Sequence, residues 1–334
     1  MARLQPPPVR YLTGADVLEA MPGIDERLAL AERTLTALVS DAEMPAKIGI
    51  HPRPAASFAH AMPAFLRGAD PDGGEDAIGM KWVAGFATNN VLGLPAINAV
   101  VVLNDAATGL PIGLLDGGPI TALRTAAISG VAIRRFAPVT GGRAHRAALI
   151  GAGTQGRSHL AVLGRVLPGV ELSLFDRHAD RAAELAAAAE ATDGIGSVAI
   201  APGSREAVDG ADIVVTAASF GPVRQVMTND WLTPDALVVP VDYATYCAAE
   251  VARDAGLFLV DDRAQFLANR EAGAFDDYPD PTATLGEALL DGTRRPERGR
   301  VVTTHLGVGL ADVIFGSAIL RHAEELGIGT LLPR

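Results

Sequence analysis

The chain has 334 residues, of which 49% are hydrophobic and 20% charged, and its net charge is −11. At roughly 150 residues per domain this length predicts two domains, the acidic balance argues against a nucleic-acid-binding protein, and no apolar run reaches the ~18 residues of a membrane helix. The first ten residues do not resemble a signal peptide, and a single cysteine, Cys247, allows no internal disulfide, so we expect a cytoplasmic protein.

The first region combines a helix with extended segments. Residues 24–40 are predicted to form an amphipathic helix, because apolar side chains such as Leu28 and Leu35 recur at helical spacing. After Pro45 the pattern becomes that of an antiparallel sheet, with a turn-rich hairpin connection and an acidic, glycine-rich loop. The predicted strands are residues 58–66, 77–86, 95–103 and 111–115, the hairpin connection is 104–109, and the loop is 67–75.

The second region alternates strands with helices. A helix at 120–136 and a linker at 137–143 lead into it. Strands that alternate with helices of 10–15 residues indicate βαβ units and a parallel sheet. The predicted strands are 147–150, 170–175, 213–217, 237–241 and 257–260, the predicted helices are 155–166 and 179–191, and a further long helix is predicted at 306–326.

Residues 151–156 match G-x-G-x-x-G directly after a strand and at the start of a helix. Such glycines permit a tight turn, a close approach to a pyrophosphate and close packing of helix on strand. Asp176 ends the next predicted strand, where an acidic side chain meets the ribose hydroxyls of a dinucleotide. The alternative is a glycine-rich turn without a ligand. The candidate cofactor-binding residues here are Gly151, Gly153, Thr154, Gln155, Gly156 and Asp176.

Asp176 also bears on the choice between NAD and NADP. A carboxylate at this position repels the 2′-phosphate of NADP, which predicts NAD. Arg177 follows directly and is able to tolerate that phosphate, so NADP remains the alternative; as a plain structural residue, Arg177 is a solvated strand end.

Six segments together resemble the ornithine cyclodeaminase/mu-crystallin family, and they run through most of the chain. The spacing of the third and fourth is the most specific feature. The segments are Ala61-Met62-Pro63-Ala64, Gly79-Met80-Lys81, Leu123-Arg124-Thr125-Ala126-Ala127, the stretch GAGTQGRSH from Gly151 to His159, Val241-Asp242, and Leu306-Gly307-Val308-Gly309-Leu310-Ala311-Asp312.

The resemblance implies an α/β subunit with two domains. An α+β dimerisation and substrate domain would comprise residues 1–125 and be completed by a C-terminal helix at 313–334. A Rossmann dinucleotide-binding domain would comprise residues 126–312. Family members look like homodimers joined through the sheet of the first domain.

The two lysines of the chain, Lys47 and Lys81, are candidates for contact with the substrate, because the other 26 of its 28 basic residues are arginines. A buried lysine is able to lose its proton, whereas arginine is not. Lys81 lies in an otherwise apolar strand, where lysine either snorkels to solvent or is buried with a depressed pKa. The resemblance assigns acid/base work on an amine or imine to Lys81, and a carboxylate or carbonyl contact to Lys47, with Arg53 as the alternative.

The remaining substrate and cofactor residues also follow from the resemblance. Arg124, whose planar guanidinium suits bidentate binding of a carboxylate, would hold the substrate carboxylate; its alternative is a salt bridge on a helix surface. Met62 is placed at the substrate, and Thr125, Thr216 and His305 at the cofactor. For His305 and His159 the plainer interpretation is a structural histidine.

Asp242 follows a buried strand at the edge where parallel sheets bind ligands. In cyclodeaminases the matching aspartate is thought to handle the distal amine of the substrate and to shuttle its proton; the alternative is a turn aspartate. Cyclodeaminases usually continue with a Pro-Gly-Lys-type segment and a glutamate, whereas this chain continues with residues 243–250 as Tyr-Ala-Thr-Tyr-Cys-Ala-Ala-Glu. The departure weakens the assignment to ornithine.

The sequence therefore predicts an NAD-dependent enzyme acting at the α-carbon of an amino acid, with a small-molecule amino acid or imine as its substrate. In the cyclodeaminase hypothesis, oxidation to an imine is followed by cyclisation, ammonia release and re-reduction. The alternative is an amino-acid dehydrogenase or an imine (ketimine) reductase. A non-catalytic nucleotide-bound binding protein is the alternative from another class. No metal is expected, because no cluster of His, Cys, Asp or Glu has metal-ligand spacing.

Overall fold

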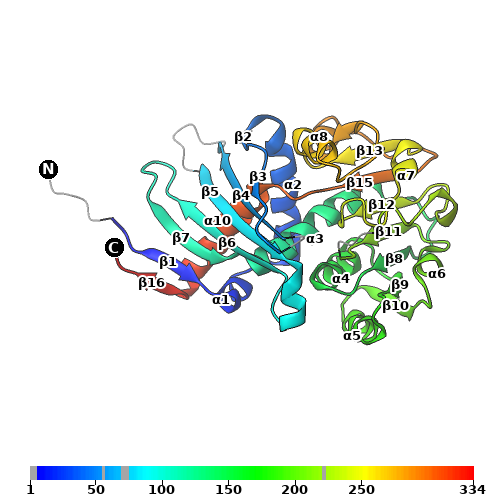
Figure 1. Ribbon diagram of the computed structural model, residues 1–334, viewed down its shortest axis with the longest axis horizontal. Helices are drawn as coiled ribbons and strands as arrows, with labels where there is room; N and C mark the ends of the chain where they lie inside the picture. The colour runs from blue at the N-terminus through cyan, green and yellow to red at the C-terminus, as the bar shows by residue number, and fades with distance from the viewer. Residues whose placement is uncertain (1–5, 55–56, 69–74, 220–222) are drawn as a thin grey trace. The chain divides into compact units, whose positions relative to one another are not determined.

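The computed structural model describes residues 6–54, 57–68, 75–219 and 223–334, which form two compact units (Figure 1). The first unit lies within Met1–Arg124 and Val308–Arg334, and the second is Thr125–Gly307. Asp312, which the sequence analysis placed in the dinucleotide-binding region, therefore belongs to the first unit. Residues 69–74 of the predicted acidic loop lie outside the described residues.

The first unit is a sheet with a helix along one face. The described strands run in the order β16-β1-β7-β6-β5-β4-β2, and β3 pairs with β4. Helix α10 packs on β4, β5 and β6, with α2 beside it (Figure 1). The elements are β1 (Val9–Leu12), α1 (Gly14–Glu19), α2 (Ile24–Ser40), β2 (Ala42–Glu43), β3 (Ile48–Ile50), β4 (Ser57–Leu66), β5 (Ala77–Phe86), the 3₁₀ turn η1 (Ala87–Leu92), β6 (Ile97–Asn104), β7 (Pro111–Asp116), α10 (Gly309–Leu326) and β16 (Thr330–Leu332), and α3 (Gly117–Phe136) begins in this unit.

Two expectations for this unit need correction. The sheet is mixed, because β1 runs parallel to β7 while the pairings from β4 through β7 are antiparallel. The C-terminal helix occupies Gly309–Leu326 and ends at Gly327, which adopts the left-handed conformation (φ 69°), so that the chain turns back into β16. The predictions of a helix from 306 and of one to 334 were therefore too long.

The second unit is a parallel sheet, five of whose strands follow the 3-2-1-4-5 order of a dinucleotide-binding fold. Its strands run in the order β10-β9-β8-β11-β12-β15-β13-β14, and every pairing given for them is parallel. Five of them, β8, β11, β12, β13 and β15, are short apolar runs that are buried along nearly their whole length, as expected for strands covered on both faces. The elements are β8 (Arg146–Ile150), α4 (Thr154–Val166), β9 (Val170–Phe175), α5 (Ala179–Glu190), β10 (Ile195–Ile200), α6 (Ser204–Val208), β11 (Ile213–Thr216), η2 (Asn229–Trp231), β12 (Leu237–Pro240), α7 (Ala249–Arg253), β13 (Leu257–Val260), α8 (Arg263–Glu271), β14 (Ala283–Thr284), α9 (Leu285–Leu290) and β15 (Val301–Thr304).

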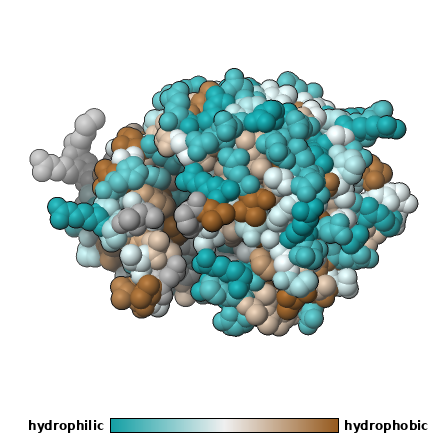
Figure 2. Space-filling view, turned by 45° about the vertical axis from the view of Figure 1, so that its right-hand side comes forward, coloured by the Kyte–Doolittle hydropathy of each residue, from teal (hydrophilic) through white to brown (hydrophobic). Residues whose placement is uncertain are grey.

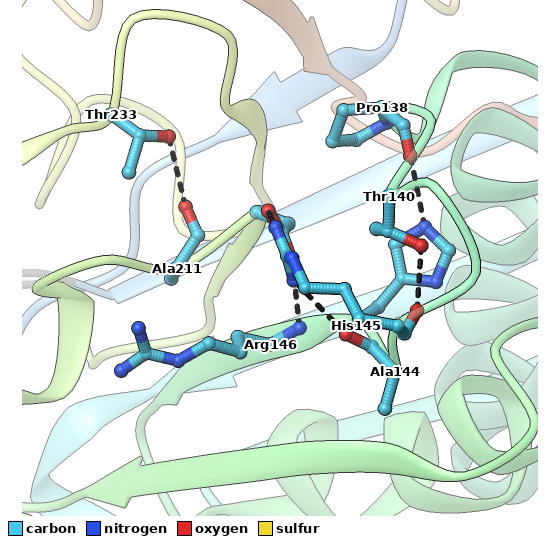
Figure 3. A network of polar contacts seen from close by, with 9 residues as sticks. Pro138, Thr140, Ala144, His145, Arg146, Ala211 and Thr233 are labelled. Carbon is cyan, nitrogen blue, oxygen red and sulfur yellow. Dashed lines mark hydrogen bonds and ion pairs between the residues drawn. The ribbon is translucent and has the colours of Figure 1, made fainter.

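An ion pair fixes the linker between α3 and β8. The two terminal nitrogens of Arg143 each lie 2.6 Å from a carboxylate oxygen of Asp212, and Asp212 also accepts a hydrogen bond from the backbone N–H of Arg146 at 2.9 Å. The Nε2–H of His145 donates to the carbonyl of Pro138 at 2.9 Å (Figure 3). The predicted linker is therefore an ordered connection tied to the start of β11.

The surface in view in Figure 2 is mostly hydrophilic, with apolar side chains in separate patches. None of the helices in the described part of the chain is both long and apolar enough to cross a membrane.

Candidate active site

Lys81 is buried in the middle of the first unit's sheet. On β5 it alternates with Trp82, so the lysine points to the covered face of the sheet and the tryptophan to the opposite, exposed face. Its pairing partners are Met62 on β4 and Val101 on β6. The Lys81 side chain is 2% exposed, which excludes the snorkelling alternative.

Lys81 and Arg124 share one carboxylate, that of Asp312. Lys81 Nζ lies 2.6 Å from Asp312 Oδ2, and Arg124 Nε lies 3.3 Å from Asp312 Oδ1. Asp312 is fully buried in the first turn of α10, where the helix dipole favours a negative charge. Gly309 permits this approach, since a Cβ there would lie 2.5 Å from the carbonyl oxygen of Met62.

The surroundings of Lys81 make its amine easy to deprotonate. Burial and the charges of Arg124 and Lys47 together lower its pKa from 10.5 to about 7, although the charge and hydrogen bond of Asp312 act in the opposite direction. Near neutral pH the amine is therefore populated in both charged and neutral forms. Such a group is suited to give or take a proton.

Arg124 has a buried nitrogen available for an anion. Its side chain is 5% exposed, and Nη1 has no hydrogen-bond partner among the described residues. A buried N–H donor without an acceptor is costly, and a carboxylate is the acceptor that a guanidinium matches best. The alternative of a helix-surface salt bridge is excluded by this burial.

Met62 and Lys47 both belong to the surroundings of Lys81. Met62 pairs with Lys81, and Lys47 directly precedes β3, from where its charge acts on Lys81. Lys47 is half-buried, whereas Arg53 is exposed. The geometry therefore favours Lys47 over Arg53 as the second basic group near Lys81.

His60 is a residue of this region that the sequence analysis missed. It lies two residues before Met62, on the same face of β4, and its ring stacks on Phe58 with 4.6 Å between the centroids. Burial, together with the charges of Lys47, His51 and Lys81, lowers the pKa of His60 to about 4. The imidazole is therefore neutral in surroundings that favour an anion.

The loop at 151–156 has the geometry of a pyrophosphate cradle. Gly151 adopts φ +105°, and a Cβ there would lie 2.5 Å from the carbonyl oxygen of Ala217. A Cβ on Gly156 would lie 2.0 Å from the carbonyl oxygen of Gly151. Gly153 caps the 13-residue helix α4, and nothing lies within 4 Å of the position of its Cβ. The exposed helix N-terminus and the open space above Gly153 fit a dinucleotide pyrophosphate.

Asp176 follows β9 and lies against this loop. Its Oδ2 accepts a hydrogen bond from the backbone N–H of Ala152 at 2.8 Å, and its Oδ1 accepts one from His178 at 2.9 Å. Arg177 is exposed, and its Nε donates to the ring of His178 at 3.1 Å. The carboxylate thus lies where a ribose is expected, while Arg177 is held by its neighbour.

Asp242 follows β12 and is bound to the end of β11. Its Oδ1 accepts a hydrogen bond from the Thr216 hydroxyl at 2.8 Å and its Oδ2 one from the backbone N–H of Ala218 at 3.0 Å. Burial raises the pKa of Asp242 to about 7 against the effect of these hydrogen bonds. The next residue, Tyr243, has a left-handed backbone (φ 58°), a strained conformation of the kind concentrated at functional sites. Thr216, assigned to the cofactor, uses its hydroxyl to hold Asp242.

Thr125 and His305 are both buried in the second unit, on α3 and directly after β15. His305 bonds to Ser129, a residue that the sequence analysis did not single out. Asp312 lies in one of the segments that resemble the family, but no function was predicted for it. Its signal in the sequence is that it is the one charged residue among the twelve from 309 to 320. Among the described residues, no group of three His, Cys, Asp or Glu side chains is placed to hold a metal ion.

Known proteins match this chain over most of its length. The model of the ornithine cyclodeaminase/mu-crystallin family matches residues 13–297. The nodulation efficiency protein NfeD of Rhizobium meliloti is 35% identical, covering 97% of this chain and 98% of that protein. The ketimine reductase mu-crystallin of Mus musculus is 26% identical, covering 77% of this chain and 78% of that protein. The structure of Thermococcus litoralis Δ1-pyrroline-2-carboxylate reductase with NADH and L-proline superimposes with a TM-score of 0.83 at 25% identity, covering 97% of this chain and all of that one.

Proposed function

The chain belongs to the ornithine cyclodeaminase/mu-crystallin family, and we propose that it is an NAD-dependent oxidoreductase that interconverts an α-imino acid and the corresponding amino acid. The observation that carries this proposal is the buried Lys81–Asp312–Arg124 cluster, which combines a proton-exchanging amine with an unpaired guanidinium nitrogen. The ketimine reductase and the pyrroline-carboxylate reductase among its relatives act on substrates of this class by name.

The residues of the first unit divide the work on the substrate. Arg124 Nη1 binds the substrate carboxylate, and Lys47 adds positive charge on the same side of the sheet. Lys81 delivers a proton to the imine nitrogen, or removes one from the amine in the reverse direction. Asp312 holds Lys81 and Arg124 in place. When bound at the cradle of residues 151–156, NAD(H) supplies hydride exchange at the α-carbon, and the carboxylate of Asp176 favours it over NADP(H).

Cyclodeamination is the second candidate, and Asp242 is the observation that bears on it. A buried carboxyl with a pKa of about 7 is suited to exchange a proton with a distal amine. Both of its oxygens, however, already accept hydrogen bonds from Thr216 and Ala218. We therefore rank the reductase or dehydrogenase above the cyclodeaminase, and both above a binding protein without turnover.

A single assay separates the three candidates. The purified chain is mixed with NADH or NADPH and Δ1-pyrroline-2-carboxylate, and with NAD and L-proline, L-alanine or L-ornithine, while absorbance at 340 nm and ammonia are followed. We expect NADH to be consumed with the cyclic imine, faster than NADPH. Ammonia release from ornithine without a net absorbance change would identify a cyclodeaminase instead. If none of these substrates is turned over, a fluorescence titration that shows NADH binding would favour the binding protein.

We further propose that the chain is a homodimer joined through the exposed face of the first unit's sheet. The family relative alanine dehydrogenase is described as a dimer. Large apolar side chains on this face are exposed, and a second copy of the same face would cover them. They are Tyr11, Ile48, Ile50, Ile78 and Trp82. The cytoplasm is the proposed location, in keeping with a single, buried cysteine.

Replacing Trp82 by glutamate is expected to give monomers, because the charge would have to be buried without a partner at the centre of the interface. Sedimentation velocity measures the change in mass. The matched control is Val139→Glu, which places the same charge at an apolar residue that is 96% exposed in the linker. A Trp82→Glu variant that sediments as the unchanged chain does would contradict this interface.

A further inference from the structure

Three buried side chains of the second unit form a continuous hydrogen-bonded row. Nε2 of His159, on α4, lies 2.8 Å from the hydroxyl of Ser129 on α3, and that hydroxyl lies 2.8 Å from Nε2 of His305. At the other end, Nδ1 of His159 lies 2.6 Å from the carbonyl oxygen of Gln155. The three residues are 0%, 0% and 3% exposed. The position of each hydrogen in the row is therefore determined by hydrogen bonds within the protein and not by bulk water.

The Gln155 carbonyl fixes the direction of the whole row. A carbonyl only accepts, so Nδ1 of His159 carries a hydrogen. Burial lowers the pKa of His159 to about 4, so its ring is neutral and its Nε2 is a bare acceptor. Ser129 therefore donates its hydrogen to His159 and accepts one from Nε2 of His305. A neutral His305 consequently has its hydrogen on Nε2 and a lone pair on Nδ1.

The row connects the two parts of the predicted cofactor site. Gln155 belongs to the loop of residues 151–156, at the start of α4. His305 directly follows β15, whose last residue, Thr304, donates a hydrogen bond to the carbonyl of Pro240 at the end of β12. Asp242 lies just beyond β12, so His305 and Asp242 lie at the ends of neighbouring parallel strands. That edge of the sheet is where such folds bind the reactive end of a ligand.

We propose that Gln155, His159 and Ser129 lock His305 in its Nε2–H tautomer, so that Nδ1 accepts a hydrogen bond from the carboxamide N–H of the nicotinamide. His305 is thus a positioning residue for the cofactor, and Ser129 and His159 act through it. The identity of the ligand rests on the proposed NAD-dependent function. The tautomer of His305 does not depend on that function, because it is a property of the chain without ligand.

The tautomer is tested first, by long-range ¹⁵N–¹H NMR of the histidine-labelled chain without cofactor. The seven histidines are assigned with His305→Asn and His159→Gln, each of which removes one ring. We expect His305 to carry its hydrogen on Nε2 in the unchanged chain, and the second tautomer to appear in Ser129→Ala, where Nε2 has lost its acceptor. A hydrogen on Nδ1 of His305 in the unchanged chain, or no effect of Ser129→Ala, overturns the lock.

The cofactor contact is tested by comparing dissociation constants for NADH and for its 3-acetylpyridine analogue, in which a methyl group replaces the carboxamide nitrogen. One hydrogen bond predicts that the unchanged chain prefers NADH about fivefold to tenfold. His305→Gln keeps a donor toward Ser129 but has no acceptor at the position of Nδ1. The ratio of its two dissociation constants should therefore approach one. His305→Asn places an amide oxygen near Nδ1 and should keep the preference.

The control is Thr303→Val, which removes a buried hydroxyl without a hydrogen-bond partner among the described residues, two positions from His305. It should keep the preference of the unchanged chain. Equal affinities of the unchanged chain for the two nucleotides, or a preference retained in His305→Gln, overturns the contact. If the unchanged chain binds neither nucleotide, the proposed function fails while the NMR result on the lock still stands.

Discussion

Replacement of Lys81 by methionine is expected to lower kcat by about 10²–10⁴-fold, the usual contribution of a general acid or base, and to leave the dissociation constant for NADH unchanged. Methionine fills a similar volume on the buried face of β5 but carries no proton. The cradle of residues 151–156 belongs to the second unit, so its affinity should not depend on this side chain. Turnover is measured at 340 nm and NADH binding by fluorescence titration.

The variant Lys81→Arg distinguishes the contribution of proton transfer by Lys81 from the contribution of its positive charge. Arginine keeps a positive charge beside Asp312 but does not release its proton near neutral pH. We therefore expect it to be about as inactive as the methionine variant. Turnover within about tenfold of the unchanged chain would mean that Lys81 supplies charge alone.

The pH dependence of turnover gives the same assignment from the unchanged chain. With a pKa of about 7, Lys81 is mostly protonated below that pH and mostly neutral above it. Imine reduction needs the protonated amine, so its rate should fall as the pH rises through about 7. Oxidation of the amino acid needs the neutral amine, so its rate should rise over the same interval.

The sequence was most informative where a strand or helix is determined by its own residues. The strands β5, β9 and β13 were predicted with the bounds that the structure has, because each is a continuous or alternating apolar run. The strands that were missed depend on partners far along the chain. β1, for example, is four residues long and is held between β7 and β16. β10 is an edge strand with mostly exposed side chains, so it carries no hydrophobic pattern.

The candidate site shows the same division. Lys81 was identified because a lysine in an apolar strand is unusual, and the loop at 151–156 because its glycines have a known spacing. Asp312 was not identified, because it meets Lys81 and Arg124 only when α10 packs on the sheet. Asp312 lies 188 residues after Arg124 in the chain. The row from His159 to His305 likewise joins three elements separated in the chain, and two histidines and a serine have no spacing that predicts it.

Replacement of Asp312 by asparagine is expected to destabilise the fold by about 3 kcal/mol, because it leaves Lys81 and Arg124 buried without their shared counter-charge. Asparagine has the same shape, so packing at the start of α10 is retained. The loss should be larger at about pH 6 than at about pH 9. Asp312 raises the pKa of Lys81, so its attraction contributes below the folded-state pKa of about 7, where Lys81 is charged, and fades as that amine loses its proton. Urea unfolding at both pH values measures the difference.

The double variant Lys81→Met/Asp312→Asn decides whether this loss arises from Lys81. In the methionine background the destabilisation by Asp312→Asn should shrink by about 1–3 kcal/mol, the coupling expected for groups in direct contact. Its dependence on pH should also disappear, since Arg124 stays charged throughout this range. Additive effects of the two substitutions would contradict the pairing. We expect a coupling that is present near pH 6 and lost near pH 9. The stability of the fold would then depend on the same proton of Lys81 that the proposed reaction requires.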